Sequence, residues 1–522
     1  MTYFYQNLKQ FGDSIALIQG DAELSYSGLA KQVEERALAI QNAVEQSMSD
    51  MGLNGSEADQ PAKRLVGMIA DNSVASVVNY LALLSLNYAI LFISEAQLET
   101  HQKNVDKAHN RETQPLDVIS AYQIRVVIHE ETFHTLHPQS AKDNSDTQTM
   151  LPSIQDNVAL LLSTSGSTGT SKQVVLSYDN LQANCDSICA YLPIEKSDVT
   201  ITTLPFNYSY GLSIINTHLA VGASIVLTSL SVMQREFWQT FERHAVTSFG
   251  GVPHSYEMLL RLKFTSMALP SLKYFTQAGG KLSPDRVKQL ASYASDNHKS
   301  FFVMYGQTEA TARMAYADHI KLLAKPETIG KAIPNTRLRV EGDELVFTGE
   351  NVMLGYANSC RDLASMPGVA VLYTGDLAYE DDDGDFFITG RSKRIVKLFG
   401  ERLSLDALQN SLQSALQRCA DSQTWHNMIE HVFCVGDDKR LHIAVVVSGV
   451  AKQSDADIEL ILNMLKQYMR NLNIHASAMK YHIINETPLT SNGKVDYPGL
   501  LASLQSQQVA SRSATGQAGD QS

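Results

Sequence analysis

Short apolar runs and longer amphipathic stretches alternate along the first half of this chain. The apolar runs Leu65 to Ile69, Val126 to His129 and Val158 to Leu162 predict buried strands. Amphipathic periodicity predicts helices, and these cover Tyr26 to Val44, Ser73 to Leu86 and Tyr178 to Ala190. Strands that alternate with helices favour an α/β fold with mostly parallel sheets sandwiched by helices.

Three further strand patterns between residues 246 and 316 each end in a loop with glycine. The pairs at the strand ends are Gly250-Gly251, Gly279-Gly280 and Tyr305-Gly306. Ligands bind at the carboxyl ends of strands in open α/β sheets. We therefore expect these three loops to line one cleft, although ordinary turn glycines would explain each of them singly.

The pattern changes after about Arg391. Val432 to Val447 reads as strands, Asp455 to Leu472 as a helix and Met479 to Ile484 as a strand. The expected organisation is a large domain at 1–390, a small α+β domain at 391–502 and a disordered tail at 503–522 rich in Gln, Ser and Ala. Residues 46–63 and 135–157 are expected to be surface loops.

Bulk properties exclude some classes of protein. The chain has 522 residues and a net charge of −13, which argues against a general nucleic-acid binder. The most apolar region, Val77 to Ile93, is interrupted by polar residues and is short for a membrane span, so a buried helix followed by a strand is expected. Five cysteines without metal-like spacing and an N-terminus unlike a signal peptide predict a cytoplasmic protein.

A loop rich in glycine and hydroxyl groups follows the strand that ends at Leu162. It runs from Ser163 to Lys172, and its glycines let backbone amides approach an anion. The candidate phosphate ligands are Thr164, Ser165, Gly166, Ser167, Thr168, Gly169 and Lys172. It is not a Walker A loop, because Lys172 follows Ser171 and precedes Gln173. A solvated Ser/Gly linker is the alternative.

This loop resembles the phosphate-binding loop of the adenylate-forming enzymes, the superfamily of acyl-CoA synthetases, luciferases and peptide-synthetase adenylation domains. Four more signatures of that family follow in its order, and together they cover about residues 1–500. They are Tyr305-Gly-Gln-Thr-Glu309, Tyr373-Thr-Gly-Asp376, Gly390-Arg391 with Lys393, and Pro488-Leu-Thr-Ser-Asn-Gly-Lys494.

The resemblance implies a role for each matching residue in binding ATP and Mg²⁺. Glu309 would be the metal ligand, and Thr308 would contact the α-phosphate. The base pocket would comprise Tyr305, Gly306, Gly279, Gly280 and Lys281.

In the same family the matching aspartate binds the ribose, here Asp376, and Arg391 reaches the ribose and phosphates. Lys494 would stabilise charge at the reacting centre. Lys393 would be the hinge of a small mobile lid domain. The acidic run Glu380 to Asp385 is better explained as a hairpin turn than as a metal site.

The acyl pocket matches the family less closely. Its candidate residues are Tyr208, Tyr210, Gly211, Ile214, Val252, Ser255, Tyr256 and Met314. Tyr208 stands where many acyl-CoA synthetases have histidine, and a phenol does not titrate near neutrality. Since no acid stands where amino-acid-activating relatives bind an ammonium group, a fatty or other non-amino acid is expected.

The expected function is ATP-dependent activation of a carboxylic acid to an acyl-AMP with release of pyrophosphate. The acyl group then passes to the thiol of CoA or of the phosphopantetheine on a separate acyl or peptidyl carrier protein. A stand-alone enzyme that activates an amino acid or aryl acid remains open. Two other classes also remain: a non-catalytic nucleotide-binding relative and a P-loop phosphotransferase.

Overall fold

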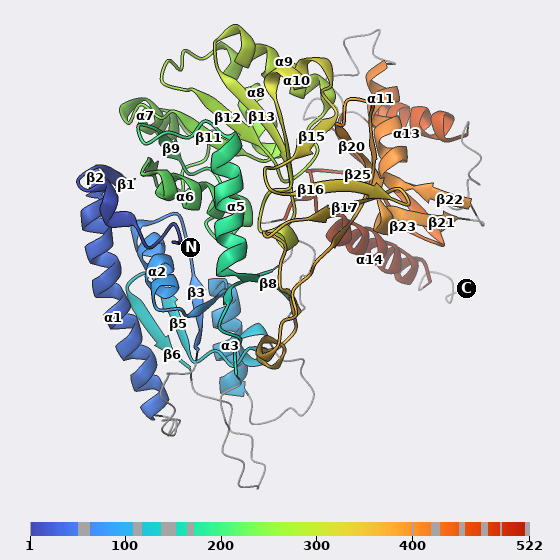
Figure 1. Cartoon of the computed structure of the whole chain (residues 1–522). Coiled ribbons are helices and arrows are strands. Elements are labelled where there is room, and N and C mark those ends of the chain that lie inside the picture. The colour runs from blue at the N-terminus through green and yellow to red at the C-terminus, as the bar shows by residue number, and fades with distance from the viewer. Residues whose placement is uncertain are drawn as a thin grey trace. The chain divides into compact units, whose positions relative to one another are not determined.

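The computed structural model describes residues 2–50, 63–107, 117–136, 153–163, 172–398, 401–418, 429–447, 455–470, 479–490 and 493–516. The chain forms two compact units (Figure 1). The first comprises Met1–Leu338 and Val346–Leu372, and the second comprises Arg339–Leu345 and Tyr373–Ser522. The units thus divide nearer to Tyr373 than to the predicted boundary at Arg391.

One sheet of the first unit contains six neighbouring parallel strands. Its order is β13-β12-β11-β9-β10-β1, with antiparallel β14 and β15 beyond β13 and antiparallel β2 beyond β1. The bounds are β1 Ile15–Gln19, β2 Ala22–Ser25, β9 Val199–Ile201, β10 Ser224–Val226, β11 Ser248–Gly251, β12 Tyr274–Gln277, β13 Ser300–Tyr305, β14 Ala315–Asp318 and β15 Thr328–Ala332.

The second sheet has the order β18-β8-β7-β4-β3-β5-β6, and its four central strands β7, β4, β3 and β5 are parallel. The bounds are β3 Leu65–Ile69, β4 Ala89–Phe92, β5 Val126–His129, β6 Thr132–Thr135, β7 Val158–Ser163, β8 Gln173–Ser177 and β18 Gly355–Ala357. The three predicted strands of this half are therefore confirmed, and Val77 to Ile93 forms a buried helix followed by β4, as expected.

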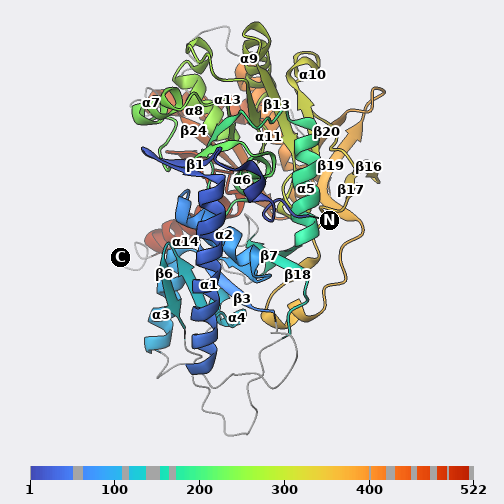
Figure 2. The same cartoon turned by 60° about the vertical axis from the view of Figure 1, so that its left-hand side comes forward.

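Helices pack on both faces of each sheet. Apolar side chains of α2, α5 and α6 join the two sheets in one core, whereas α7 to α10 cover the other face of the first sheet and α3 and α4 that of the second. Figures 1 and 2 show α1 beside α2 and α5 beside α6. The bounds are α1 Tyr26–Asp50, α2 Val74–Ser85, α3 Glu95–Lys107, α4 Val118–Ala121, α5 Tyr178–Tyr191, α6 Ser209–Val221, α7 Arg235–Arg243, α8 Pro253–Arg261, α9 Pro284–Asp296 and α10 His319–Ala324.

Local signals explain where these helices begin. Ser177 and Asn180 form a reciprocal capping box at the start of α5, and the Ser73 side chain accepts a hydrogen bond from the Ser76 amide at the start of α2. No helix in the described parts of the chain is both long and apolar enough to cross a bilayer.

The second unit is α+β. It begins with the hairpin residues Arg339–Leu345 of β16 and β17, followed by β19, β20 and the short pair β21 and β22; β23, β24 and β25 form a separate sheet. The bounds are β16 Arg337–Glu341, β17 Glu344–Thr348, β19 Leu372–Glu380, β20 Phe386–Arg391, β21 Ile395–Leu398, β22 Glu401–Ser404, β23 Ile429–Asp437, β24 Arg440–Val447, β25 Met479–Ile484, α11 Leu405–Arg418, α13 Asp455–Arg470 and α14 Tyr497–Gly516.

The expected tail differs from the structure. Helix α14 continues to Gly516, so residues 503–516 are helical rather than disordered. Leu500 and Leu504 are buried in a cluster with Phe433, Val435 and the apolar face of β24, and this contact anchors the helix. The prediction of disorder from composition was wrong, because two leucines one helical turn apart suffice to dock a polar helix on an apolar surface.

Candidate active site

The three glycine-containing loops follow neighbouring strands. Gly251 at the end of β11 lies opposite Gln277 in β12, which lies opposite Val303 in β13. Their carboxyl ends therefore meet at one edge of the sheet. This is the edge where a parallel sheet binds ligands.

Two predicted site residues from distant parts of the chain meet at one tyrosine. The Nζ of Lys172 lies 3.6 Å from the ring centroid of Tyr356. The hydroxyl of Tyr356 donates a hydrogen bond of 2.9 Å to Oε1 of Glu309. Strand β18 pairs with β8 and sets Tyr356 opposite Val174, which explains why it reaches both partners. The three residues form what we call the Lys–Tyr–Glu cluster.

The protonation of this cluster follows from its surroundings. Burial, and then the charge of Glu309, raise the pKa of Tyr356, so the phenol stays protonated and donates to the carboxylate. One carboxylate oxygen of Glu309 is thus held in place. Carboxylate oxygens are the ligands that Mg²⁺ prefers, so Glu309 fits the metal role implied by the family resemblance.

The segment after β13 is clamped by buried contacts. Asn351 donates hydrogen bonds from Nδ2 to the carbonyl oxygens of Ala310 and Arg313, each 2.9 Å long. Thr311 has a φ of 65°, a rare conformation for a β-branched residue, and its hydroxyl donates to the Asn351 carbonyl at 2.7 Å. A Cβ at Gly306 would overlap the Ala312 carbonyl oxygen. The conformation that orients Thr308 and Glu309 is therefore fixed by tertiary contacts.

The residues expected to shape the base pocket lie at the ends of β12 and β13. Gly279 has a φ of 84°, and the Gln277 side chain donates to the Gly280 carbonyl at 2.9 Å. Lys281 is exposed, and the Tyr305 hydroxyl accepts a hydrogen bond from Gln307 Nε2 at 3.3 Å.

In the second unit, Asp376 and Arg391 form an ion pair. They face each other in the β19–β20 register, and Arg391 Nε lies 2.8 Å from Asp376 Oδ1. The Asp376 side chain is 3% exposed, whereas that of Arg391 is 63% exposed. The sequence named both residues for the ribose but did not predict their pairing.

Lys494 lies in a tight turn between Leu489 and Val495, which form an isolated bridge. The Thr490 amide donates to the Lys494 carbonyl at 2.7 Å, and the Lys494 amide donates to the Thr490 hydroxyl at 3.2 Å. Gly493 has a φ of 71°, which the turn requires. The backbone of Thr490 and Lys494 is therefore held in place, and the side chain of Lys494 is half-buried.

The predicted hinge residue Lys393 is exposed and lies in the short turn η5, Ser392–Arg394. The next residue, Arg394, is anchored in the second unit: its Nε lies 2.6 Å from Asp406, and its guanidinium lies 3.6 Å from the ring centroid of Tyr497. The sequence did not single out this anchor.

Most predicted acyl-pocket residues are buried together in the first unit. The hydroxyls of Tyr210 and Tyr256 both donate to the Thr276 carbonyl, at 2.9 and 2.7 Å. Burial raises the pKa of Tyr208 and Tyr256, so both are uncharged phenols. The other buried candidates are Gly211, where a Cβ would overlap the Pro205 carbonyl, Val252 and Met314.

The sequence did not single out two residues that lie beside predicted site residues. Tyr356 joins Lys172 to Glu309, and Arg313, beside the predicted Met314, is 2% exposed. The only available signal for Arg313 was its place four residues after Glu309. A charged side chain there gave no indication of burial.

Two predictions concern loops. The phosphate-loop residues 164–171 lie outside the described residues. The acidic run forms the turn between β19 and β20, as expected: the amides of Asp383 and Asp385 donate to Asp381 Oδ1, at 3.1 and 3.0 Å. The carboxylates of Asp381, Asp383 and Asp385 lie close together, and the hydrogen bonds to Asp381 account for this grouping as part of the turn.

Comparison with known proteins identifies the family. The signature of the AMP-binding enzymes matches residues 4–357, which is most of the chain. The chain belongs to the AMP-binding enzyme family. This agrees with the resemblance to adenylate-forming enzymes and with the α/β fold of the first unit.

Individual relatives of this AMP-binding chain are distant. It is 26% identical to an anguibactin system regulator of Vibrio anguillarum over 95% of the chain, and it spans only 47% of that relative's length. It is 27% identical to a D-alanine–D-alanyl carrier protein ligase of Staphylococcus haemolyticus, over 69% of the chain and 74% of the relative. O-succinylbenzoate coenzyme A synthetase from Bacillus subtilis, solved with ATP and a magnesium ion, shares the fold: the TM-score is 0.67 at 17% identity, over 95% of this chain and 99% of the other.

Proposed function

We propose that this protein is an AMP-forming acid–thiol ligase. The observation that supports this best is the Lys–Tyr–Glu cluster, because it unites a cation for phosphate with a carboxylate for Mg²⁺ within one compact unit. Relatives named as a carrier-protein ligase and as a coenzyme A synthetase support the same chemistry.

The reaction has two steps. A carboxylate oxygen of the acid attacks the α-phosphorus of ATP, a new acyl–O–P bond forms, and the bond to the leaving pyrophosphate breaks. A thiolate then attacks the acyl carbon, a thioester forms and AMP leaves. In the first step two anions must approach each other, so the site must offset charge and hold the reactants in place.

Each residue has a proposed part in the first step. Lys172, with the loop at 164–169, binds the β- and γ-phosphates, and Thr308 donates to the α-phosphate. Glu309 holds Mg²⁺, which would neutralise phosphate charge when bound. Tyr305, Gly306, Gly279, Gly280 and Lys281 form the base pocket.

The second unit contributes the remaining groups. Asp376 and Arg391 contact the ribose, and Lys494 stabilises charge on the reacting carboxylate and α-phosphate. We also propose the functional domains predicted from the sequence, a large domain at 1–390 and a lid at 391–502 that turns about Lys393. Cytoplasmic location likewise stays a prediction.

Exchange of labelled pyrophosphate into ATP, dependent on an added acid, tests the first step. Lys494→Ala should lower the exchange rate at least about 100-fold, because a preorganised charge at the reacting centre is removed. Lys439→Ala is the matched control, since Lys439 is exposed in the turn between β23 and β24. Full exchange by Lys494→Ala would refute the mechanism, and ADP as the product would favour a phosphotransferase.

The acceptor is decided in the second step. Enzyme loaded with acyl-AMP is offered CoA or a holo-carrier protein, and AMP release is followed. CoA and a carrier protein are both compatible with the named relatives. A chain that exchanges pyrophosphate but transfers to neither thiol would be an adenylating enzyme of another kind.

A further inference from the structure

Arg313 is a buried cation within the first unit. In the described parts of the chain its side chain contacts uncharged groups: Nε donates to the sulfur of Met304 at 3.3 Å, the guanidinium carbon lies 4.0 Å from the ring centroid of Tyr210, and the side chain of Tyr191 is a further hydrogen-bond partner. The hydroxyl of Tyr191 donates to the same Met304 sulfur at 3.0 Å. A thioether and an aromatic ring stabilise a guanidinium far less than a carboxylate does.

Among the described residues, no anion compensates the charge of Arg313. In the parts of the chain that the structure describes, no aspartate or glutamate forms an ion pair with it. Burial raises the pKa of Tyr191, Tyr208 and Tyr210, so these phenols are neutral. A buried charge without a partner is strongly unfavourable, and natural proteins retain one mainly where a ligand pairs with it.

Arg313 also lines a small cavity of about 20 Å³. That volume suffices for an ordered water. Apolar atoms supply most of its lining, and hydroxyl-bearing residues also border it: Thr200, Ser213, Thr217, Ser248, Tyr274 and Thr276. These hydroxyl groups are hydrogen-bonded within the protein, so a plain alkyl chain would leave the guanidinium as the group without an ionic partner.

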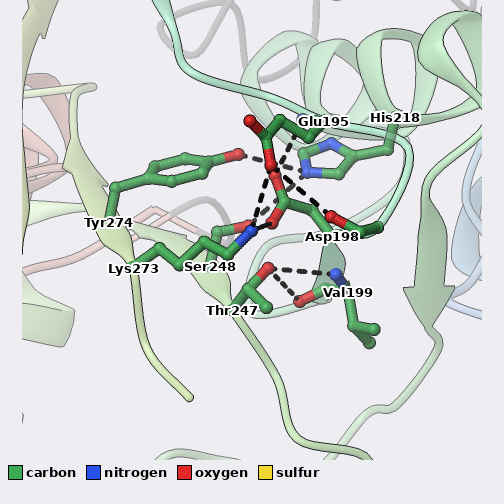
Figure 3. Close-up of polar contacts among 9 residues, drawn as sticks. Glu195, Asp198, Val199, His218, Thr247, Ser248, Lys273 and Tyr274 are labelled. Carbon is green, nitrogen blue, oxygen red and sulfur yellow. Dashed lines mark hydrogen bonds and ion pairs between the residues drawn. The ribbon is translucent and has the colours of Figure 1, made fainter. Parts of the chain in front are cut away.

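His218 lines the same cavity, and its ring contacts the hydroxyl of Tyr274 (Figure 3). Its Nδ1 lies 2.7 Å from the Ile214 carbonyl, which can only accept, so Nδ1 carries the proton. Nε2 is then an acceptor, and the Tyr274 hydroxyl donates to it at 3.3 Å. Since His218 is neutral and the Tyr274 proton is engaged, Arg313 is the group in this cavity that attracts an anion.

We propose that the acid activated by this protein carries a second carboxylate, which pairs with Arg313 at the end remote from the reacting carboxylate. The proposal rests on the ligase function and narrows its substrate class to dicarboxylic acids. Dicarboxylic acids lie within the class expected from the sequence, a fatty or other non-amino acid.

Matched pairs of acids test the proposal. The probes are hexanoate with adipate, octanoate with suberate, and 3-phenylpropanoate with 3-(4-carboxyphenyl)propanoate, each assayed by pyrophosphate release. Wild type should prefer the diacid of at least one pair. Arg313→Met should lose roughly 100-fold in kcat/KM for that diacid and gain or keep activity on its monoacid, since only the diacid loses an ion pair.

Controls separate charge from folding. Arg313→Lys keeps the positive charge and should retain part of the preference. Arg235→Met removes an exposed arginine of α7 and should behave as wild type. Tm shows whether Arg313→Met is folded, and the rise in Tm on adding each diacid without ATP gives a readout independent of turnover.

The outcomes distinguish this inference from the proposed function. Preference for monoacids, or equal losses on both members of a pair in Arg313→Met, would overturn the inference and leave the ligase function standing. Equal losses would indicate that Arg313 binds the reacting carboxylate. If no acid yields pyrophosphate, the ligase function fails. A Tm rise that only diacids cause and that Arg313→Met abolishes would then still support anion binding at Arg313. Without pyrophosphate release and without that Tm rise, both the ligase function and the inference would be overturned.

Discussion

Replacement of Tyr356 by phenylalanine tests the Lys–Tyr–Glu cluster directly. The variant keeps the ring that lies 3.6 Å from Lys172 Nζ and removes the hydroxyl that donates to Glu309. A carboxylate that binds a metal is usually oriented by a hydrogen bond to its other oxygen. Tyr356→Phe should therefore raise the Mg²⁺ concentration needed for half-maximal activity and leave the contact with Lys172 intact.

The size of the effect follows from the exposure of the bond. Hydrogen bonds to charged groups contribute about 1.5–3 kcal/mol when buried. Because Tyr356 is 41% exposed, water replaces part of the lost interaction, and we expect about 1 kcal/mol. That free energy corresponds to roughly a fivefold higher Mg²⁺ concentration for half-maximal activity.

The assay is pyrophosphate release at fixed ATP, titrated with MgCl₂. Tyr3→Phe is the matched control, because it removes a tyrosine hydroxyl that donates to a carboxylate of Asp179 at 2.8 Å near the N-terminus. The control should titrate as wild type does. A folded Tyr356→Phe enzyme with an unchanged or lower Mg²⁺ requirement would refute the orienting role of Tyr356.

Three further predictions concern the packing around the site. Gly306→Ala should abolish most activity and destabilise the fold by about 3 kcal/mol, because its Cβ would overlap the Ala312 carbonyl oxygen; a Tm and rate equal to wild type would contradict this. Lys273→Met should lower the free energy of unfolding in urea by about 2 kcal/mol. The substitution leaves the fully buried Asp198 carboxylate without the ammonium group 2.7 Å away (Figure 3). The loss is below that of a fully buried pair because Lys273 is partly hydrated. Burial lowers the pKa of His218 to about 4. The unfolded chain therefore takes up a proton below about pH 6.5 that the folded chain refuses, and this residue should cost about 2 kcal/mol of stability at pH 5 relative to pH 7. His218→Gln should remove that part of the pH dependence, and an equal loss in both proteins would disprove it.

The elements of the fold could largely be predicted from local patterns. Strands β3, β5 and β25 have the predicted ends, and the start of α5 follows from its capping residues Ser177 and Asn180. These features depend on interactions between residues near in sequence, so periodicity and capping report them. The same signals failed at α14, where burial of Leu500 and Leu504 outweighs a polar composition.

Family membership was also readable, and residues of the proposed nucleotide site could be named, because short motifs retain their order along the chain. Lys172, Glu309, Asp376, Arg391 and Lys494 could all be named from the sequence. The motifs did not show which of these residues contact one another.

The sequence by itself thus determined most of the strands and helices and the kinds of chemical groups at the proposed site. Only the tertiary structure decided that Tyr356 joins Lys172 to Glu309, that Asp376 pairs with Arg391, and that Arg313 is buried with no carboxylate of the described residues paired to it. The physical reason is that such contacts depend on strand register and on the packing of segments far apart in the chain. No local pattern records which distant side chain will face a given residue.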